Sequence, residues 1–322
     1  MQPPDKPRFT VFLAKAGDYD NAAAKKVADL LDYIDIPLSG GDAVLVKPNL
    51  LRAENTGVTC TNALIIAAVC RYLRDHGCRV TIGDSPGFGT AKGVAGSIGL
   101  DAALAKAGCA DIPIVTLDSP RNRPLTLGGH VGLSRMALEA DHIVSIPKLK
   151  AHSQMRVTGA VKNLFGCVSG VRKAFLHARH GDTLKDGVSV FPSAIVDIMG
   201  HLPRVTTVLD GIRAMHVTGP SGGEPFAANL LAVSESPTAT DTAIYAMLGV
   251  SPGEIPVWHE LRRRNEPGAF FEEIVLTGEA IEHFDFSGFV LPEKLNPETF
   301  NPARLLISTA KRLWARVAPI RS

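Results

Sequence analysis

The chain has 322 residues, of which 45% are hydrophobic and 20% charged, and its formal net charge is +2. This length and apolar content suffice for a sizeable core, and the near-balanced charge creates no overall field that favours nucleic acid. The five cysteines are odd in number and form no C-x-x-C pair, so we expect a reducing, cytoplasmic location, no disulfide framework and no iron–sulfur cluster.

Strand-like and helical segments alternate along the chain. The predicted strands are Phe9–Ala14, Ala43–Val46, Arg79–Ile82, Ile112–Leu117, Asp141–Ile146, Thr206–Leu209 and Leu230–Val233. The predicted helices are Asn21–Tyr33, Thr61–Arg74, Thr90–Ile98, Leu100–Ala107, Leu133–Ala140, Ser193–His201 and Thr238–Leu248. This alternation predicts a single α/β domain over residues 1–290, with a mostly parallel sheet covered by helices on both faces. It is compatible with two lobes around a central crevice.

The C-terminal tail, residues 291–322, differs in character from the rest of the chain. Its first part is interrupted by Pro292, Pro297 and Pro302, and Arg304–Val317 then has the pattern of a short basic amphipathic helix. Docking on its own domain is the favoured interpretation for such a helix. Binding a partner or lying on a membrane surface are the alternatives. No apolar run in the chain approaches the roughly 18 residues that span a bilayer, so we expect no transmembrane segment.

Polar residues follow four of the predicted strands. They are Lys47 and Asn49, then Asp84, then Lys148, Lys150 and His152, and finally Asp210. In open parallel sheets, ligands bind beyond the carboxyl ends of the strands, so these side chains are expected to line one crevice. The alternative interpretation is a solvated rim.

Residues 147–185 concentrate the positive charge of the chain. The segment has one acid, Asp182, and eight basic residues: Lys148, Lys150, Arg156, Lys162, Arg172, Lys173, Arg179 and Lys185. A local cluster of this kind attracts phosphate or carboxylate groups. Apolar residues surround Lys162, and Asn163 follows it directly, which favours specific anion binding over a merely solvated surface.

Three further features indicate candidate functional groups less specifically. If their segments are helical, His152 shares a face with Lys148 and His177 with Lys173, which suits acid–base chemistry. The glycine-rich loop around Gly219 is a candidate anion nest or lid, although it lacks the Walker A pattern. Asp241 is expected to cap or favour the dipole of its own helix, with pairing to a lysine of the crevice as the alternative.

Several segments together resemble the domain of unknown function 362 family. They are VLVKPNL, IGDSPG, EADHIVSIPKLKAH, TGAVKNLFGCVSG, VLDGIRAM with GPSGG, and TATDTAIYAMLG, and the likeness runs from about Val44 to Gly278. Many members of this family resemble iron–sulfur proteins because a ferredoxin module with two cysteine clusters is attached or inserted. This chain has no such clusters, so that redox role does not carry over. Its KAH at Lys150–His152 departs from the more usual KTH and removes one hydroxyl beside His152.

The leading hypothesis is an enzyme that acts on a small anionic metabolite. Its predicted catalytic residues are His152, Lys162, Asp84 and Asp210, where an aspartate orients His152 or holds a metal. Its predicted substrate-binding residues are Lys47, Asn49, Lys148, Lys150, Asn163, Lys173, His177 and Gly219. The sequence names neither a metal nor a cofactor.

Three other functions compete with this hypothesis. The main alternative is a non-catalytic protein that binds a metal or cofactor and docks to a redox protein partner. A racemase-like site around a nickel cofactor is less favoured, because it rests on a loose likeness of architecture. Nucleic-acid binding is least favoured, since Phe165 and Phe175 are the only aromatic candidates beside the basic segment.

Overall fold

A computed structural model describes residues 8–169, 184–185 and 187–295. The predicted tail helix, Arg304–Val317, lies outside the described residues, as do Lys173 and His177. Within the described part, no helix is long and apolar enough to cross a membrane.

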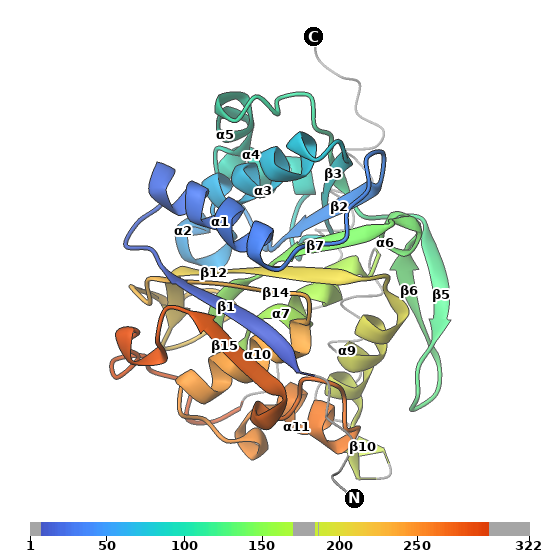
Figure 1. The fold of residues 1–322 in the computed structure, drawn as a ribbon. Helices are drawn as coiled ribbons and strands as arrows, with labels where there is room; N and C mark the ends of the chain where they lie inside the picture. Colours follow the sequence, from blue (N-terminus) through green and yellow to red (C-terminus); the bar gives the residue numbers. More distant parts are fainter. Residues whose placement is uncertain (1–7, 170–183, 186, 296–322) are drawn as a thin grey trace, which may run out of the picture.

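The centre of the molecule is a mostly parallel sheet (Figure 1). Across its main path the strands are β15 (Ile274–Gly278), β1 (Phe9–Lys15), β14 (Leu230–Ser234), β12 (Val205–His216), β7 (His142–Ile146), β2 (Ala43–Pro48), β3 (Arg79–Asp84) and β4 (Ile114–Thr116). On this path β14 runs antiparallel to both of its neighbours, and the other adjacent pairs are parallel. The predicted α/β fold is confirmed.

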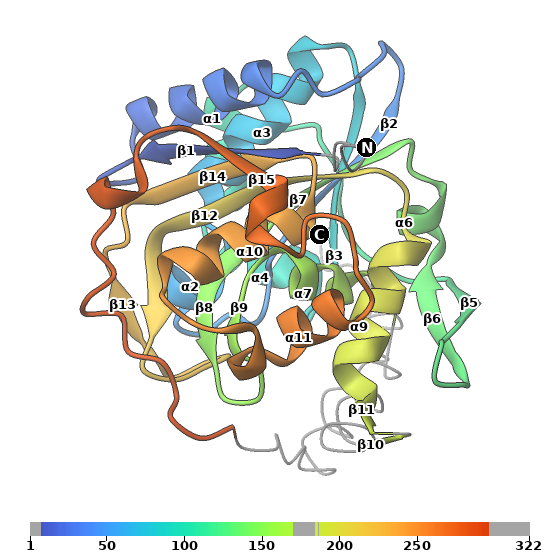
Figure 2. The ribbon, with the colours of Figure 1, turned by 60° about the horizontal axis from the view of Figure 1, so that its bottom comes forward.

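Helices cover both faces of the sheet (Figures 1 and 2). One face carries α1 (Asn21–Tyr33) and α3 (Ala63–Asp75), with α4 (Ala91–Ser97) and α5 (Leu100–Lys106) toward the β3 side. The other face carries α7 (Ala160–Asn163), α9 (Val190–His201), α10 (Pro237–Met247) and α11 (Pro256–Arg263).

Side chains of the central strands alternate between the two faces. In β2, Val44 and Val46 join the core under α1 and α3, whereas Leu45 joins the core under α9. Both sets are buried, because a parallel sheet with two helical layers has no solvated face. Ordinary caps start the helices: the Asp20 side chain accepts the Ala23 N–H at the start of α1, and the Ser236 side chain accepts the Ala239 N–H at the start of α10.

The segment after β7 is a strand, which corrects the helical interpretation of Lys148 and His152. After Pro147 the chain continues as β8 (Lys148–His152), which pairs with β12 and with β9 (Arg156–Thr158). The pairing of β2 with β7 ends at Pro48 and Ile146, so these two strands separate at their carboxyl ends. In a strand, Lys148, Lys150 and His152 share one face by their two-residue spacing, and no helical turn is needed.

Other boundaries also differ from the prediction. β12 extends to His216, so Asp210 lies within the strand, at the point where its partner changes from β7 to β8. The predicted helix Leu133–Ala140 is reduced to α6 (Arg135–Glu139), because Leu133 belongs to the second strand of a hairpin. That hairpin joins β5 (Pro120–Pro124) and β6 (His130–Ser134), and Gly128 and Gly129 supply its turn with φ values of 92° and 84°.

The remaining elements are small. They are α2 (Thr56–Thr59), β10 (Leu184–Lys185), β11 (Val188–Ser189), β13 (Glu224–Phe226) and short 3-10 turns at Leu164–Cys167, Pro252–Glu254, Phe271–Glu273 and Ile281–His283. The first of these turns continues α7 directly and keeps its residues against the sheet.

Candidate functional site

A buried ion pair joins the carboxyl ends of β2 and β3. Lys47 Nζ lies 2.8 Å from Asp84 Oδ1, and both side chains are almost entirely buried. The Asp84 carboxylate also accepts the backbone N–H groups of Leu50 (2.8 Å) and Ser85 (2.9 Å). These bonds place the carboxylate firmly, because each of its oxygens accepts a backbone donor.

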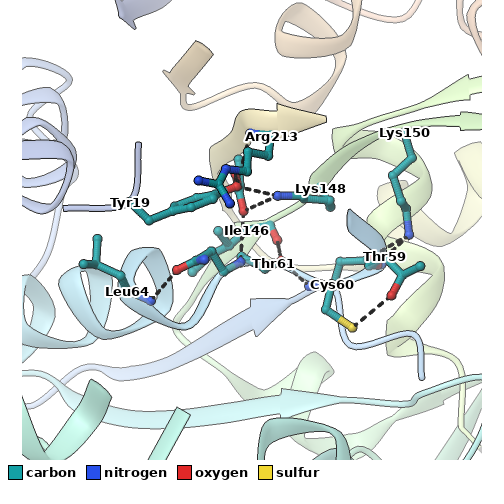
Figure 3. Close-up of polar contacts among 12 residues, drawn as sticks. Tyr19, Thr59, Cys60, Thr61, Leu64, Ile146, Lys148, Lys150 and Arg213 are labelled. Atoms are coloured by element: carbon teal, nitrogen blue, oxygen red, sulfur yellow. Dashed lines mark hydrogen bonds and ion pairs between the residues drawn. The ribbon is translucent and has the colours of Figure 1, made fainter. Parts of the chain in front are cut away.

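A second buried ion pair joins β8 to β12. Lys148 Nζ lies 3.0 Å from Asp210 Oδ2, and both side chains are fully buried. The Tyr19 hydroxyl donates to Asp210 Oδ1 (2.7 Å) and accepts from Lys148 Nζ (2.6 Å). Figure 3 shows Tyr19 and Lys148 pointing toward one another. The backbone N–H of Asn62 donates to Asp210 Oδ2 (2.9 Å). Burial is the main cause that lowers the pKa of Lys148, and the Asp210 carboxylate opposes it.

Asn163, at the end of α7, connects the first ion pair to the rest of the site. Its Oδ1 accepts from Lys47 Nζ and from Asn49 Nδ2, each at 3.3 Å. Its Nδ2 donates to the Lys47 carbonyl (3.2 Å) and to Ser145 Oγ (2.9 Å). A buried amide with this many partners is fixed in orientation.

Lys150 is buried like Lys47 and Lys148 but donates to neutral oxygens. Its Nζ donates to Asn49 Oδ1 (2.6 Å) and to the Thr59 carbonyl (3.0 Å), the latter visible in Figure 3. Loss of hydration on burial is the largest cause that lowers the pKa of Lys150, to about 7, and the charges of Lys162 and Lys148 lower it further. Near neutral pH, Lys150 is therefore close to the midpoint between ammonium and amine.

His152 and Lys162 form a third contact, between β8 and α7. Lys162 Nζ lies 2.9 Å from His152 Nε2. His152 Nδ1 accepts the backbone N–H groups of Gln154 (3.1 Å) and Met155 (3.3 Å), so the proton of the neutral ring belongs on Nε2. An ammonium cannot accept that N–H, so a hydrogen bond from His152 Nε2 to Lys162 Nζ forms only when Lys162 has lost a proton.

The structure brings most of the predicted site residues together. Those that converge at the carboxyl ends of β2, β3, β7 and the middle of β12 are Lys47, Asn49, Asp84, Lys148, Lys150, His152, Lys162, Asn163 and Asp210. Gly219 contacts the end of β8. Its carbonyl accepts the Ser153 N–H (2.9 Å), and the Ala151 carbonyl leaves no room for a Cβ at this glycine.

Tyr19 belongs to this site although no motif pointed to it. It lies in the loop between β1 and α1, near the carboxyl end of β1, and contacts both Lys148 and Asp210. The rule that was applied to the other strand ends also covers this position, because the loop follows the predicted strand Phe9–Ala14. Thr59, Thr61 and Asn62 were likewise missed, since they contribute backbone groups or a side chain from a segment that carries little charge.

The donor set of the described residues offers little to a metal ion. Within residues 8–169, 184–185 and 187–295, no three His, Cys, Asp or Glu side chains gather closely enough to hold one. Asp84 and Asp210 each bind a lysine. All five cysteines are buried and form no disulfide.

The chain matches one protein-family model and one relative along most of its length. A model of the family described as "Domain of unknown function (DUF362)" matches residues 44–246, a shorter span than the predicted 44–278. A protein of Synechocystis sp., named thylakoid-associated protein sll1697, is 34% identical in an alignment of 317 residues that covers 95% of this chain and 95% of that protein.

The comparison with solved structures includes two bacterial proteins. A crystal structure of a protein from Thermotoga maritima has a TM-score of 0.40 at 11% identity over 63% of this chain, and this chain spans 53% of it. The lactate racemase apoprotein of Thermoanaerobacterium thermosaccharolyticum has a TM-score of 0.35 at 12% identity over 65% of this chain, and this chain spans 52% of it.

Proposed function

This chain belongs to the domain of unknown function 362 (DUF362) family, and we propose that it is an enzyme acting on a small metabolite with a phosphate or carboxylate group. The observation that supports this proposal most directly is the environment of Lys150. Lys47 and Lys148 are neutralised by Asp84 and Asp210, whereas the hydrogen bonds of Lys150 go to neutral oxygens. A buried ammonium without a carboxylate gains from an anionic ligand, because the ligand replaces its lost hydration.

The contact between His152 and Lys162 supports proton transfer as part of the reaction. In the arrangement fixed by the β8–β9 turn, His152 presents its N–H to the Lys162 nitrogen. In the step that we propose, the lone pair of the Lys162 amine leaves the His152 N–H and takes a proton from the bound substrate. The bonding electron pair stays on the substrate, Lys162 becomes an ammonium, and His152 keeps the lysine side chain in place. Paired groups at hydrogen-bond distance are the usual arrangement for general acid–base work.

The two carboxylates act in this proposal as orienting groups. Asp84 holds Lys47 and, through the Leu50 N–H, the start of the loop after β2. Asp210 holds Lys148 and, through the Asn62 N–H, the start of α3. Substrate contacts by Lys173, His177 and Gly219 remain predictions from the sequence.

A metabolite screen with site variants tests this function. Thermal-shift measurements with phosphorylated and carboxylated metabolites should identify compounds that raise the melting temperature of the wild type, because a ligand that binds the folded state stabilises it. Turnover of such a compound should disappear in Lys162→Ala and in His152→Ala, while both variants keep wild-type circular dichroism.

The outcomes separate the competing functions. Full turnover in both variants contradicts the assignment of His152 and Lys162. A coloured, metal-containing protein after anaerobic purification that turns over none of the compounds supports instead the non-catalytic, cofactor-binding role.

We further propose that the tail contacts a membrane surface peripherally. The relative named as thylakoid-associated is similar over nearly the whole chain, and the sequence of Arg304–Val317 has the pattern of a basic amphipathic helix. Co-sedimentation with vesicles that contain anionic lipid should occur for the wild type and be lost in the double variant Leu306→Asp, Trp314→Asp. Equal co-sedimentation of the two proteins, or none of the wild type, rejects this role.

A further inference from the structure

Asp241 is a buried carboxylate that does not cap its own helix. It lies in the first half of α10 and is 1% exposed, while Ser236 supplies the N-cap of that helix. Its carboxylate instead reaches the first turn of α7, where Oδ1 accepts the Ala160 N–H (2.6 Å) and Oδ2 accepts the Val161 N–H (3.0 Å). Both expectations from the sequence, a local cap and a lysine partner, are replaced by a cap on a different helix.

The helix that Asp241 caps is the element that carries Lys162 and Asn163. α7 has four residues, and no side chain of the preceding segment caps it. A helix this short is unstable by itself, because one turn costs more in conformational entropy than its few hydrogen bonds return. Its place therefore depends on contacts from outside, and the two bonds to Asp241 satisfy donors that have no partner within the helix.

The approach of α10 to α7 is close and specific. At Gly159, the residue before α7, an added Cβ would collide with Asp241 Oδ1. The Tyr245 side chain, one turn further along α10, also hydrogen-bonds to Asp241. Burial raises the pKa of Asp241 to about 6, and the bonds from Val161, Ala160 and Tyr245 oppose that rise. The ionised carboxylate is therefore retained in the core chiefly by the donors of α7.

We infer that Asp241 is a positioning residue for the site: it holds α7 so that Lys162 reaches His152 and Asn163 reaches Lys47 and Asn49. This inference rests on the proposed function for its consequence, but its geometry is independent of any ligand. The side chains of Lys162 and Asn163 leave α7 within three residues of the capped amides. A small displacement of that turn moves the Lys162 nitrogen away from His152 Nε2, and positioning errors of about 1 Å have large effects on catalytic and binding groups.

The test compares Asp241 with a second buried carboxylate, which accepts a backbone N–H from the turn of the β5–β6 hairpin. Asp197 accepts the Thr126 N–H (2.9 Å) and binds Arg264 (2.7 Å), so Asp197→Asn is a matched control outside the site. Hydrogen exchange of the Ala160 and Val161 amides is measured in the full chain for the wild type, Asp241→Asn, Asp241→Ala and Asp197→Asn. Affinity for inorganic phosphate is measured by calorimetric titration in the same proteins.

We expect exchange at Ala160 and Val161 to be faster in Asp241→Ala than in Asp241→Asn, because asparagine retains one acceptor oxygen. Phosphate affinity should fall by about tenfold in Asp241→Ala and less in Asp241→Asn, a loss of about 1.4 kcal/mol in the former. Asp197→Asn should leave both readouts near wild type even where it lowers the melting temperature. Rescue by Asp241→Asn distinguishes positioning from general destabilisation.

The outcomes keep the two proposals separate. Unchanged exchange at Ala160 and Val161 in Asp241→Ala overturns the positioning role, whatever the protein binds. Faster exchange together with wild-type phosphate affinity also overturns it, because α7 would then not control the site. A wild type that does not bind phosphate counts against the anion-binding function, while the exchange experiment still decides the role of Asp241.

Discussion

Lys47 and Lys148 lie against carboxylates, whereas Lys150, which occupies the same face of β8 as Lys148, donates to an amide and a backbone carbonyl. All three lysines are buried, so burial alone does not separate them. The difference lies in the charge of their partners. A lysine that is paired with a carboxylate ties two strands together, whereas a protonated lysine with neutral partners has a charge that no bonded carboxylate offsets, which is the basis of the role proposed for Lys150.

The strongest test of this comparison removes one member of a buried pair. Asp210→Ala leaves Lys148 buried without a carboxylate, and breaking such a pair costs about 3–5 kcal/mol in the free energy of unfolding. Urea unfolding followed by circular dichroism measures this cost. The double variant Lys148→Met, Asp210→Leu should recover much of the loss, because no charge then remains buried. A small loss in the single variant contradicts a structural role for the pair.

The next largest loss of stability is expected from a change in the packing around the Lys47–Asp84 pair. Gly166 lies so close to Lys47 and Asp84 that an added Cβ would overlap both side chains. Gly166→Ala should lower the free energy of unfolding by about 1–3 kcal/mol, the usual cost of overpacking a tight core. Gly200→Ala is the control, since Gly200 lies in α9 with nothing within 4 Å of a Cβ. It should raise stability by about 0.5–1 kcal/mol.

Lys150 should make the stability of the folded protein depend on pH. Its pKa falls from 10.5 to about 7 on folding, so between those values the unfolded chain binds more protons than the folded protein. Its contribution to the free energy of unfolding therefore rises with pH across this interval. Lys150→Met should flatten that slope, measured by urea unfolding between pH 7.5 and 9.

Phosphate binding provides the functional side of the same prediction. The ammonium form of Lys150 attracts the anion, so affinity should weaken as the pH rises through about 7. Lys150→Met should weaken binding at pH 6.5 by about tenfold and lose most of this pH dependence. Calorimetric titration at several pH values measures both. A variant with wild-type affinity at pH 6.5 would place the anion elsewhere.

The smallest effect is expected for an exposed ion pair. Such a pair tests the effect of pairing without burial. Lys25 and Asp29 lie 2.7 Å apart on α1, with side chains that are 74% and 45% exposed. Lys25→Ala should change the free energy of unfolding by about 0.5 kcal/mol or less, because solvent screens such pairs. A loss comparable to that of Asp210→Ala would show that burial does not explain the importance of the internal pairs.

The sequence by itself determined the α/β class, the order of most strands and helices, and the convergence of Lys47, Asp84, Lys148, Lys150 and Asp210. These follow from local patterns, since apolar periodicity specifies the elements and parallel strands bring their carboxyl ends to one edge. The strand character of Lys148–His152 was missed although polar and apolar residues alternate there, because the segment has only five residues and the four-residue spacing of Lys148 and His152 also fits one face of a helix. Tyr19 was missed although its loop follows a predicted strand, because its partners Lys148 and Asp210 lie far away in the chain. The hairpin of β5 and β6 is a local pair, and it was missed because the apolar residues from Leu133 onward were interpreted as a helix.

Only the tertiary structure decided which charges are paired. Asp84 lies 37 residues from Lys47, Asp210 lies 62 residues from Lys148, and Asp241 lies 81 residues from the Ala160 amide that it accepts. Composition reveals that these groups exist, but a pKa and a free energy depend on distances of a few ångströms and on burial. Those distances are properties of the folded sheet, and they give Lys150 neutral hydrogen-bond acceptors where Lys47 and Lys148 have carboxylates.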